Sequence, residues 1–128
     1  MRLEKKSFSQ LKKQADKVFS LFIRKKYSNW KDEVRCYTCD KVFNVKEIQC
    51  GHYISRVYTN LRWAEENCRP QCYRCNVLLK GNLDEFSIRL EREKRGTLER
   101  LHNWKHLPST PVKRLDLIDI IKKYEKAI

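Results

Sequence analysis

The chain has 128 residues, with 29 lysines and arginines against 16 acidic residues, so its formal net charge at pH 7 is +13. This length suits one domain with appended helices, and we expect residues 1–128 to form a single unit. The first six residues are mostly charged, which argues against a signal peptide, and no apolar run is long enough to cross a bilayer. The composition therefore predicts a cytoplasmic protein with no membrane partner, and it gives no sign of a small-molecule cofactor.

The positive charge is concentrated near the N-terminus. Residues 1–35 hold 11 basic and 4 acidic residues, a net charge of +7, whereas residues 36–82 and 83–128 carry +3 each. Such a field attracts a polyanion, whose counterions are released on contact. We favour a nucleic-acid partner; a basic surface that serves only solubility is the alternative.

The basic segment 1–30 contains a predicted amphipathic helix over residues 8–26, which Ser7 or Ser9 could cap. Packing on the rest of the domain is the simplest use of its apolar face, and contact with a partner helix is the alternative. The apolar positions recur at helical spacing: Phe8, Leu11, Ala15, Val18, Phe19 and Phe22.

Residues 31–82 form the predicted core, and residues 83–128 a helical C-terminal part. In chain order, we expect a tight turn at the first cysteine pair, a short strand or loop over 41–48, a strand or extended loop over 53–61, and a helix over 75–80 that Gly81 ends. A helix over 83–95, a loop around Pro108 and Pro111, and a helix over 114–127 follow. The last helix should bury an apolar side made of Leu115, Leu117, Ile118, Ile121 and Tyr124.

Two Cys-x-x-Cys pairs, Cys36–Cys39 and Cys72–Cys75, are separated by 32 residues. Each pair can turn both sulfurs onto one ion, so the two pairs predict a closed, structural four-cysteine zinc site. Buried free thiols or disulfides are the alternatives, and disulfides do not suit a reducing cytoplasm. Cys68 is expected to be a small core residue and Cys50 a spare thiol.

His52 and Asn76 stand out beside these pairs. A neutral imidazole can accept a proton from water near pH 7, which suits a general base; a zinc ligand or a structural histidine are the alternatives. Asn76 directly follows Cys75, a position where it could equally cap the helix. A knuckle, a hairpin and then a helix is the order of a treble-clef zinc unit, in which His52 and Asn76 can converge.

The sequence resembles the phage NinG (Rap) recombination-endonuclease family, which belongs to the HNH or ββα-metal nucleases. The residues that carry the likeness are Cys50-Gly51-His52-Tyr53-Ile54-Ser55-Arg56, Leu61-Arg62-Trp63, Asn67, Gln71-Cys72-Tyr73-Arg74-Cys75-Asn76 and Gly81-Asn82. The resemblance implies an α+β fold: a small zinc-scaffolded, HNH-like ββα-metal core with flanking helices. It also implies a structure-selective endodeoxyribonuclease that cuts branched DNA, such as Holliday-type junctions or displaced loops.

The same resemblance assigns roles to three residues. His52 falls on the general base, with ligation of the catalytic ion as a second role, and Asn67 on the residue that pins the loop behind that histidine. Asn76 falls on a ligand of the catalytic ion, Mg²⁺ or Mn²⁺. Many HNH enzymes place a metal-binding aspartate or histidine before the base, where this chain has Gly51, so the second protein ligand stays open. The acidic pairs Glu65–Glu66 and Asp84–Glu85 are candidates, although solvated charge is the simpler role for both.

Five basic residues are candidate DNA contacts: Arg56, Arg62, Lys12, Lys13 and Lys80. An arginine can fork onto two phosphate oxygens, but a solvated charge is an equal alternative for each. Two nicks on opposed strands would suit a homodimer, formed through the Phe8–Phe22 stripe or the 114–127 helix, unless both pack within the chain. A non-catalytic zinc-knuckle protein that binds DNA or RNA is the rival function.

Overall fold

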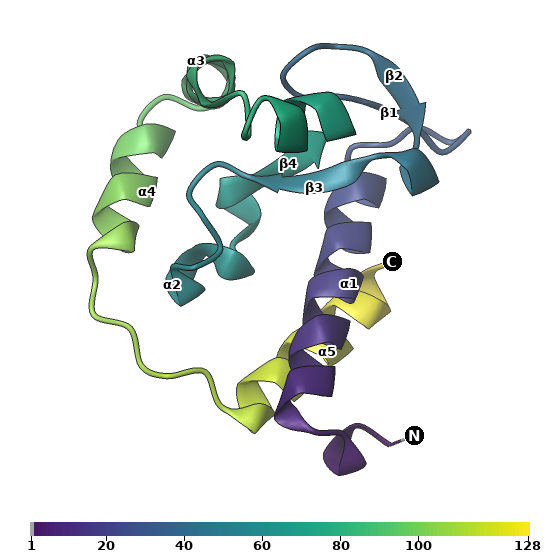
Figure 1. Ribbon diagram of the computed structural model, residues 1–128, viewed down its shortest axis with the longest axis vertical. Helices are drawn as coiled ribbons and strands as arrows, with labels where there is room; N and C mark the ends of the chain where they lie inside the picture. The colour runs from purple at the N-terminus through teal and green to yellow at the C-terminus, as the bar shows by residue number, and fades with distance from the viewer. Residues whose placement is uncertain (1) are drawn as a thin grey trace.

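The computed structural model describes residues 2–128, which form a mixed α+β fold with two small sheets. The sheets and α3 lie at one end, α1 runs from there to the other end, and α5 lies beside α1 at that other end (Figure 1). The helices are α1 (Phe8–Lys26), α2 (Thr59–Arg62), α3 (Leu83–Glu93), α4 (Thr97–Lys105) and α5 (Arg114–Ala127). The strands are β1 (Glu33–Arg35), β2 (Val42–Asn44), β3 (Gln49–His52) and β4 (Cys68–Gln71).

The predicted N-terminal helix is confirmed over the expected residues. Ser7 accepts a hydrogen bond from the Gln10 amide, and the Gln10 side chain accepts one from the Ser7 amide, so the two form a capping box. Leu11 and Phe19 on the expected face are buried, but Phe8 is 41% exposed because it lies in the first turn, beyond the packed part of the helix.

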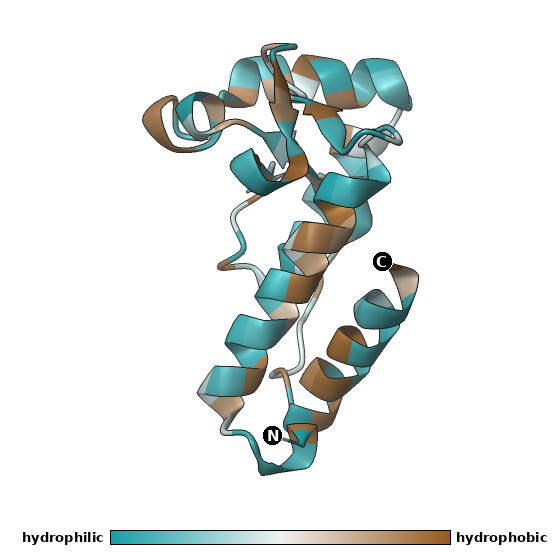
Figure 2. Cartoon of the chain, turned by 90° about the vertical axis from the view of Figure 1, so that its right-hand side faces the viewer, coloured by the Kyte–Doolittle hydropathy of each residue, from teal (hydrophilic) through white to brown (hydrophobic). Residues whose placement is uncertain are grey.

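Helix α5 packs on α1, and this contact accounts for both predicted apolar faces. Leu11 and Ala15 of α1 form one buried cluster with Leu117, Ile118 and Ile121 of α5. Figure 2 shows hydrophobic stripes on both helices. The two faces are therefore not available as the proposed dimer interface. Leu115 was wrongly assigned to the apolar side: it is 73% exposed.

Two antiparallel hairpins carry the residues of the core. In the first, Val34 pairs with Phe43, and in the second, His52 pairs with Cys68. The prediction of a strand or extended loop over 53–61 was wrong in part. The strand is β3, which ends at His52, and a loop then leads into α2, because Asn67 binds the backbone across this segment.

The helix predicted after the second cysteine pair is a short π-helix, Arg74–Leu78. Gly81 follows it at a φ of 95°, a left-handed conformation that favours glycine. Helix α3 ends at Glu93, near the predicted boundary, and α4 follows Gly96. The predicted proline loop runs from α4 back to α5 along the outside of the molecule (Figure 1). Within residues 2–128, no helix is long and apolar enough to span a bilayer.

Candidate functional site

The four predicted zinc ligands meet at the end of the first hairpin. Cys36 and Cys39 lie in its turn, Cys72 follows β4, and Cys75 lies in the π-helix. Their four sulfur atoms lie within 4.8 Å of one another, and those of Cys39 and Cys72 are 3.8 Å apart. Two sulfurs bound to one tetrahedral zinc are about 3.8 Å apart, so the cluster could hold a zinc ion.

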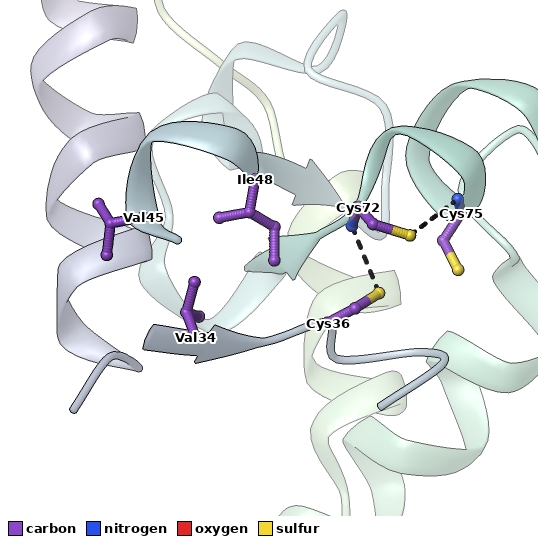
Figure 3. Packing of buried hydrophobic residues seen from close by; sticks show 6 residues of the cluster. All are labelled: Val34, Cys36, Val45, Ile48, Cys72 and Cys75. Carbon is purple, nitrogen blue, oxygen red and sulfur yellow. Dashed lines mark hydrogen bonds between the residues drawn. The ribbon is translucent and has the colours of Figure 1, made fainter. Parts of the chain in front are cut away.

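Backbone amides donate hydrogen bonds to two of these sulfurs, and they favour the thiolate most at Cys36, whereas burial raises the pKa of Cys39 and Cys72. The Cys72 amide donates to Cys36 Sγ over 3.3 Å, and the Cys75 amide donates to Cys72 Sγ over 3.5 Å (Figure 3). Burial acts to raise the pKa of Cys36, but hydrogen bonds from Cys72 and Thr38 outweigh it and lower that pKa to about 7. A thiolate binds zinc directly, so the donor set fits the metal.

A second feature is a cavity of about 430 Å³ between α1, β3 and the loop after β3. It brings together His52 and Asn76, which are 24 positions apart in the sequence, as the resemblance suggested. Its lining residues are Asp16, Phe19, Ser20, Gln49, Cys50, His52, Ser55, Arg56, Arg62 and Asn76.

His52 is held in one orientation by a backbone group. Its Nε2 lies 2.8 Å from the carbonyl oxygen of Arg62. A carbonyl oxygen only accepts, so Nε2 carries the proton of the neutral ring, and Nδ1 holds the free lone pair. Burial lowers the pKa of His52 from its usual 6.5, and the bond to Arg62 opposes this shift. At pH 7 the ring is therefore neutral, with Nδ1 as its basic atom.

Asn67 ties together the loop that follows His52. Its side chain accepts a hydrogen bond from the Ile54 amide and donates to the carbonyl groups of Ile54 and Leu61. Its own carbonyl accepts from the Tyr53 amide. Asn67 is fully buried, so these bonds fix the path of residues 53–61 and thereby the position of the Arg62 carbonyl that His52 contacts.

Asn76 reaches the cavity from the π-helix and donates from Nδ2 to Gln49 Oε1 over 2.8 Å. No other side-chain hydrogen bond of Asn76 occurs within the described chain, so its Oδ1 is available to a ligand. The helix-capping alternative is not what its side chain does here. Gln49 was not singled out in the sequence, because it lies outside every cysteine or histidine motif.

The structure gives a steric reason for Gly51. A Cβ at this position would lie 1.9 Å from Oε1 of Gln71, whose side chain fills the space. Gln71 is fully buried and donates to Thr38 and to the Gly81 carbonyl, while its Oε1 has no partner in the described residues. A side chain at position 51 would therefore have to displace that of Gln71.

A family model described as the bacteriophage lambda NinG protein matches residues 1–128. The chain belongs to the NinG family. No curated protein and no solved structure matches it. The matched residues include those of the four-cysteine cluster and those that line the cavity.

Asp16 is a second cavity residue, besides Gln49, that the sequence analysis missed. It lies on α1 and accepts from Nε and Nη2 of Arg62 and from Nε1 of Trp63. It therefore holds the peptide whose carbonyl group contacts His52. A single aspartate in a basic helix gives no signal in sequence, because its partners lie more than 40 residues away.

Of the five candidate DNA contacts of the NinG chain, only the two arginines, Arg56 and Arg62, line the cavity. The side chain of Arg56 is 60% exposed, whereas that of Arg62 is 15% exposed and engaged by Asp16. Lys12, Lys13 and Lys80 do not line the cavity. Their contact with DNA stays a prediction.

The acidic pairs do not supply a ligand to this cavity. Glu65 binds Lys26 and Tyr124, and Glu66 binds Arg100, in a separate groove. Asp84 and Glu85 belong to the first turn of α3, where Glu85 binds Arg89. Among residues 2–128, Asp16 is the only one that lines the cavity with a carboxylate.

Proposed function

We propose that this NinG-family chain is a metal-dependent endonuclease of branched DNA, with an HNH-like ββα-metal core and an active site in the cavity of His52 and Asn76. The observation that carries the proposal is the hydrogen bond from His52 Nε2 to the Arg62 carbonyl. It leaves a neutral ring with a basic Nδ1 at the wall of a polar cavity. A neutral base of this kind suits phosphodiester hydrolysis near pH 7.

His52 would accept a proton from a water molecule at Nδ1 while the water oxygen attacks phosphorus. The bond between phosphorus and the 3′ oxygen breaks, the departing oxygen takes a proton from solvent, and the products are a 5′-phosphate and a 3′-hydroxyl. The Arg62 carbonyl accepts from Nε2 throughout and stabilises the imidazolium that forms. Asn67 and Asp16 hold that carbonyl in place, from the loop and from α1 respectively.

The donors in the cavity fit a hard divalent cation. Asn76 and Gln49 offer amide oxygens, which Mg²⁺ and Mn²⁺ accept together with water and substrate phosphate. Such an ion, when bound, supplies positive charge that stabilises the phosphorus transition state. The zinc of the four cysteines has a closed shell, so its role would be structural only.

Arg56 is the basic residue best placed to bind the strand that is cut. Its side chain is largely exposed at the cavity, and its distance of 3.9 Å from Asp16 leaves the guanidinium without a close partner there. The net charge of +7 on residues 1–35 would attract a second DNA arm. A homodimer, if one forms, must use a surface other than the packed faces of α1 and α5.

The proposal is tested by incubating labelled four-way-junction and duplex DNA with the protein, with and without Mg²⁺. His52→Ala should lower the cleavage rate at least ~10²–10⁴-fold, because it removes the base. Junction binding and zinc content should stay unchanged. His102→Ala is the matched control, since His102 is an exposed histidine on α4.

Asn76→Ala separates the cation from the base. Its cleavage defect should be partly reversed at high Mg²⁺ or Mn²⁺, because a weakened ligand set is compensated by mass action. The defect of His52→Ala should not respond to added cation. If His52→Ala cuts junction DNA at the wild-type rate, His52 is not the base and the proposed active site is wrong. If wild type cuts no junction DNA with Mg²⁺ or Mn²⁺, the enzyme proposal is wrong, and a non-catalytic zinc-knuckle DNA-binding protein replaces it.

A further inference from the structure

A second group of metal-ligand side chains lies beside the cavity. Cys50, His52 and Cys68 each offer one ligand atom, and these three atoms lie within 4.8 Å of one another. The register of the second hairpin explains the grouping. Cys50 and His52 are two apart on β3, and Cys68 pairs with His52 on β4, so all three side chains project from one face of the sheet.

These three residues are not part of the structural cluster, whose ligands come from the knuckle and the π-helix. Cys68 is fully buried against α1, whereas Cys50 and His52 are half-buried and line the cavity. An ion held between the three would thus have protein on one side and the open cavity on the other. A fourth position would be left for water.

The donor set suits a thiophilic cation. Two thiolates and one imidazole favour zinc over magnesium, and two thiolate charges neutralise one divalent ion. Zinc–sulfur and zinc–nitrogen bonds place the ligand atoms of a tetrahedral site about 3.4–3.8 Å apart. The observed atoms, which lie within 4.8 Å of one another, therefore have to approach by at most about 1.4 Å.

We propose that Cys50, His52 and Cys68 form a second, exchangeable site for a thiophilic divalent cation such as Zn²⁺. The cation has a direct consequence for His52. A neutral imidazole has one lone pair, and a cation that binds it, at either nitrogen, leaves none to accept a proton from water. Excess zinc should therefore switch off cleavage, a consequence that rests on the proposed endonuclease function, whereas the site itself does not.

The binding test uses the full chain purified with its structural zinc, dialysed to remove loosely held metal, and titrated with Zn²⁺. Wild type should bind a second equivalent, and Cd²⁺ should give thiolate-to-metal absorption at that equivalent. Cys50→Ser should lower the affinity of the second equivalent at least about tenfold, since even changes outside a ligand shell cost ~10–100-fold. Cys68→Ser, which keeps the buried volume, should do the same.

Two controls make this test specific. Ser55→Ala removes a cavity residue outside the ligand set and should leave the second equivalent unchanged. His102→Ala removes one of two neighbouring surface histidines, whose rings lie 5.8 Å apart and which could bind zinc on their own. The proposal is overturned if wild type binds only one zinc, or if the second equivalent persists in Cys50→Ser and disappears in His102→Ala.

The inhibition test compares each variant with its own zinc-free rate on junction DNA at fixed Mg²⁺. Wild type should lose cleavage as zinc occupies the second site, and Cys50→Ser should need at least about tenfold more zinc for the same loss. If the second zinc binds and cleavage continues, the regulatory consequence is wrong, and the metal site stands. If wild type cuts no DNA under any condition, the proposed function is wrong, and the binding result still decides the site.

Discussion

The two ends of the molecule are stabilised in different ways. At the end with the sheets, the buried cluster consists of three cysteines and only three aliphatic side chains, Val34, Val45 and Ile48 (Figure 3). At the other end, α1 and α5 bury five aliphatic residues against each other without any cysteine. We therefore expect the cysteine-containing cluster to depend on a metal to close its core. The separate cluster of α3 at the same end, with Phe86 and Leu90, and the α1–α5 contact depend on apolar burial.

The cavity lies where these two ends meet. Helix α1 contributes Asp16 from its packed middle part, and β3 contributes His52 from the hairpin. The cysteine cluster reaches the second hairpin through Cys72, which directly follows β4, the strand paired with the one that carries His52. Asp16 of α1 holds Arg62, whose carbonyl group accepts the hydrogen bond from His52. The geometry of the base should thus respond to damage at either end, by separate routes.

The largest expected effect comes from breaking the metal end. Cys72→Ser should remove the tightly held zinc and cost on the order of 10 kcal/mol of folding free energy, because structural zinc binding is itself folding energy. Zinc content and the unfolding transition followed by circular dichroism measure this. Cys50→Ser should keep one tightly held zinc per chain, and a zinc-free protein that remains fully folded would contradict the comparison.

Breaking the helical end should cost less and leave the metal in place. Leu117 is fully buried between α1 and α5, so Leu117→Ala should lower the free energy of unfolding by about 2–5 kcal/mol. Leu115→Ala on the same helix should change it by less than about 0.5 kcal/mol, because Leu115 is 73% exposed. Urea unfolding of the zinc-loaded variants measures both changes in the free energy of unfolding. Equal losses in Leu117→Ala and Leu115→Ala would show that the α1–α5 contact does not stabilise the helical end.

The sequence predicted the features that depend on local pattern. Helical spacing and the Ser7 cap gave the bounds of α1, the paired cysteines gave the zinc cluster, and the spacing of α5 gave its limits. The sequence-based prediction failed where contacts between distant residues determine the local structure. Of the strand or extended loop expected over 53–61, the structure has a loop that leads into α2, because a buried asparagine binds its backbone. Leu115 is exposed because α1 covers only one side of α5.

The site was predicted only in part, for the same reason. Histidine and asparagine beside cysteine pairs gave His52 and Asn76, and the cavity contains both. Asp16 and Gln49 carry no local signal, since their roles come from partners 27 or more residues away. The ion pair of Arg62 with Asp16 was equally hidden: Arg62, a candidate for either a phosphate contact or a solvated charge, is held by Asp16 and still lines the cavity.

A smaller loss of stability is expected in the second hairpin, where Gly51 of β3 lies against the side chain of Gln71 of β4. Gly51→Ala should lower the free energy of unfolding by about 1–3 kcal/mol, because its Cβ would overlap Gln71 and displace the bonds of Gln71 to Thr38 and Gly81. Thermal unfolding at saturating zinc measures the loss. Adding Gln71→Ala should make the Gly51→Ala substitution nearly neutral; if the two losses simply add, steric overlap is not the cause.

The smallest effect, and the one that tests how the ends are joined, is expected for Asp16→Asn. The substitution keeps the shape but removes the charge that holds Arg62 and Trp63, so it should cost about 1.5 kcal/mol, the low end for hydrogen bonds to charged groups. Asp119→Asn on the exposed side of α5 is the matched control and should be neutral. Zinc content should be normal in both.

A second measurement separates the positioning role of Asp16 from simple stability. The His52 Nε2 proton is bonded to the Arg62 carbonyl, so its NMR signal should shift or exchange faster in Asp16→Asn but not in Leu117→Ala, which is damaged more but lacks this link. Junction cleavage should fall in the same order, Asp16→Asn below Leu117→Ala, at temperatures where both stay folded. If the His52 signal changes in proportion to the loss of stability in both variants, α1 supports the cavity only by packing. The hydrogen bonds of Asp16 to Arg62 and Trp63 then have no separate role in orienting His52.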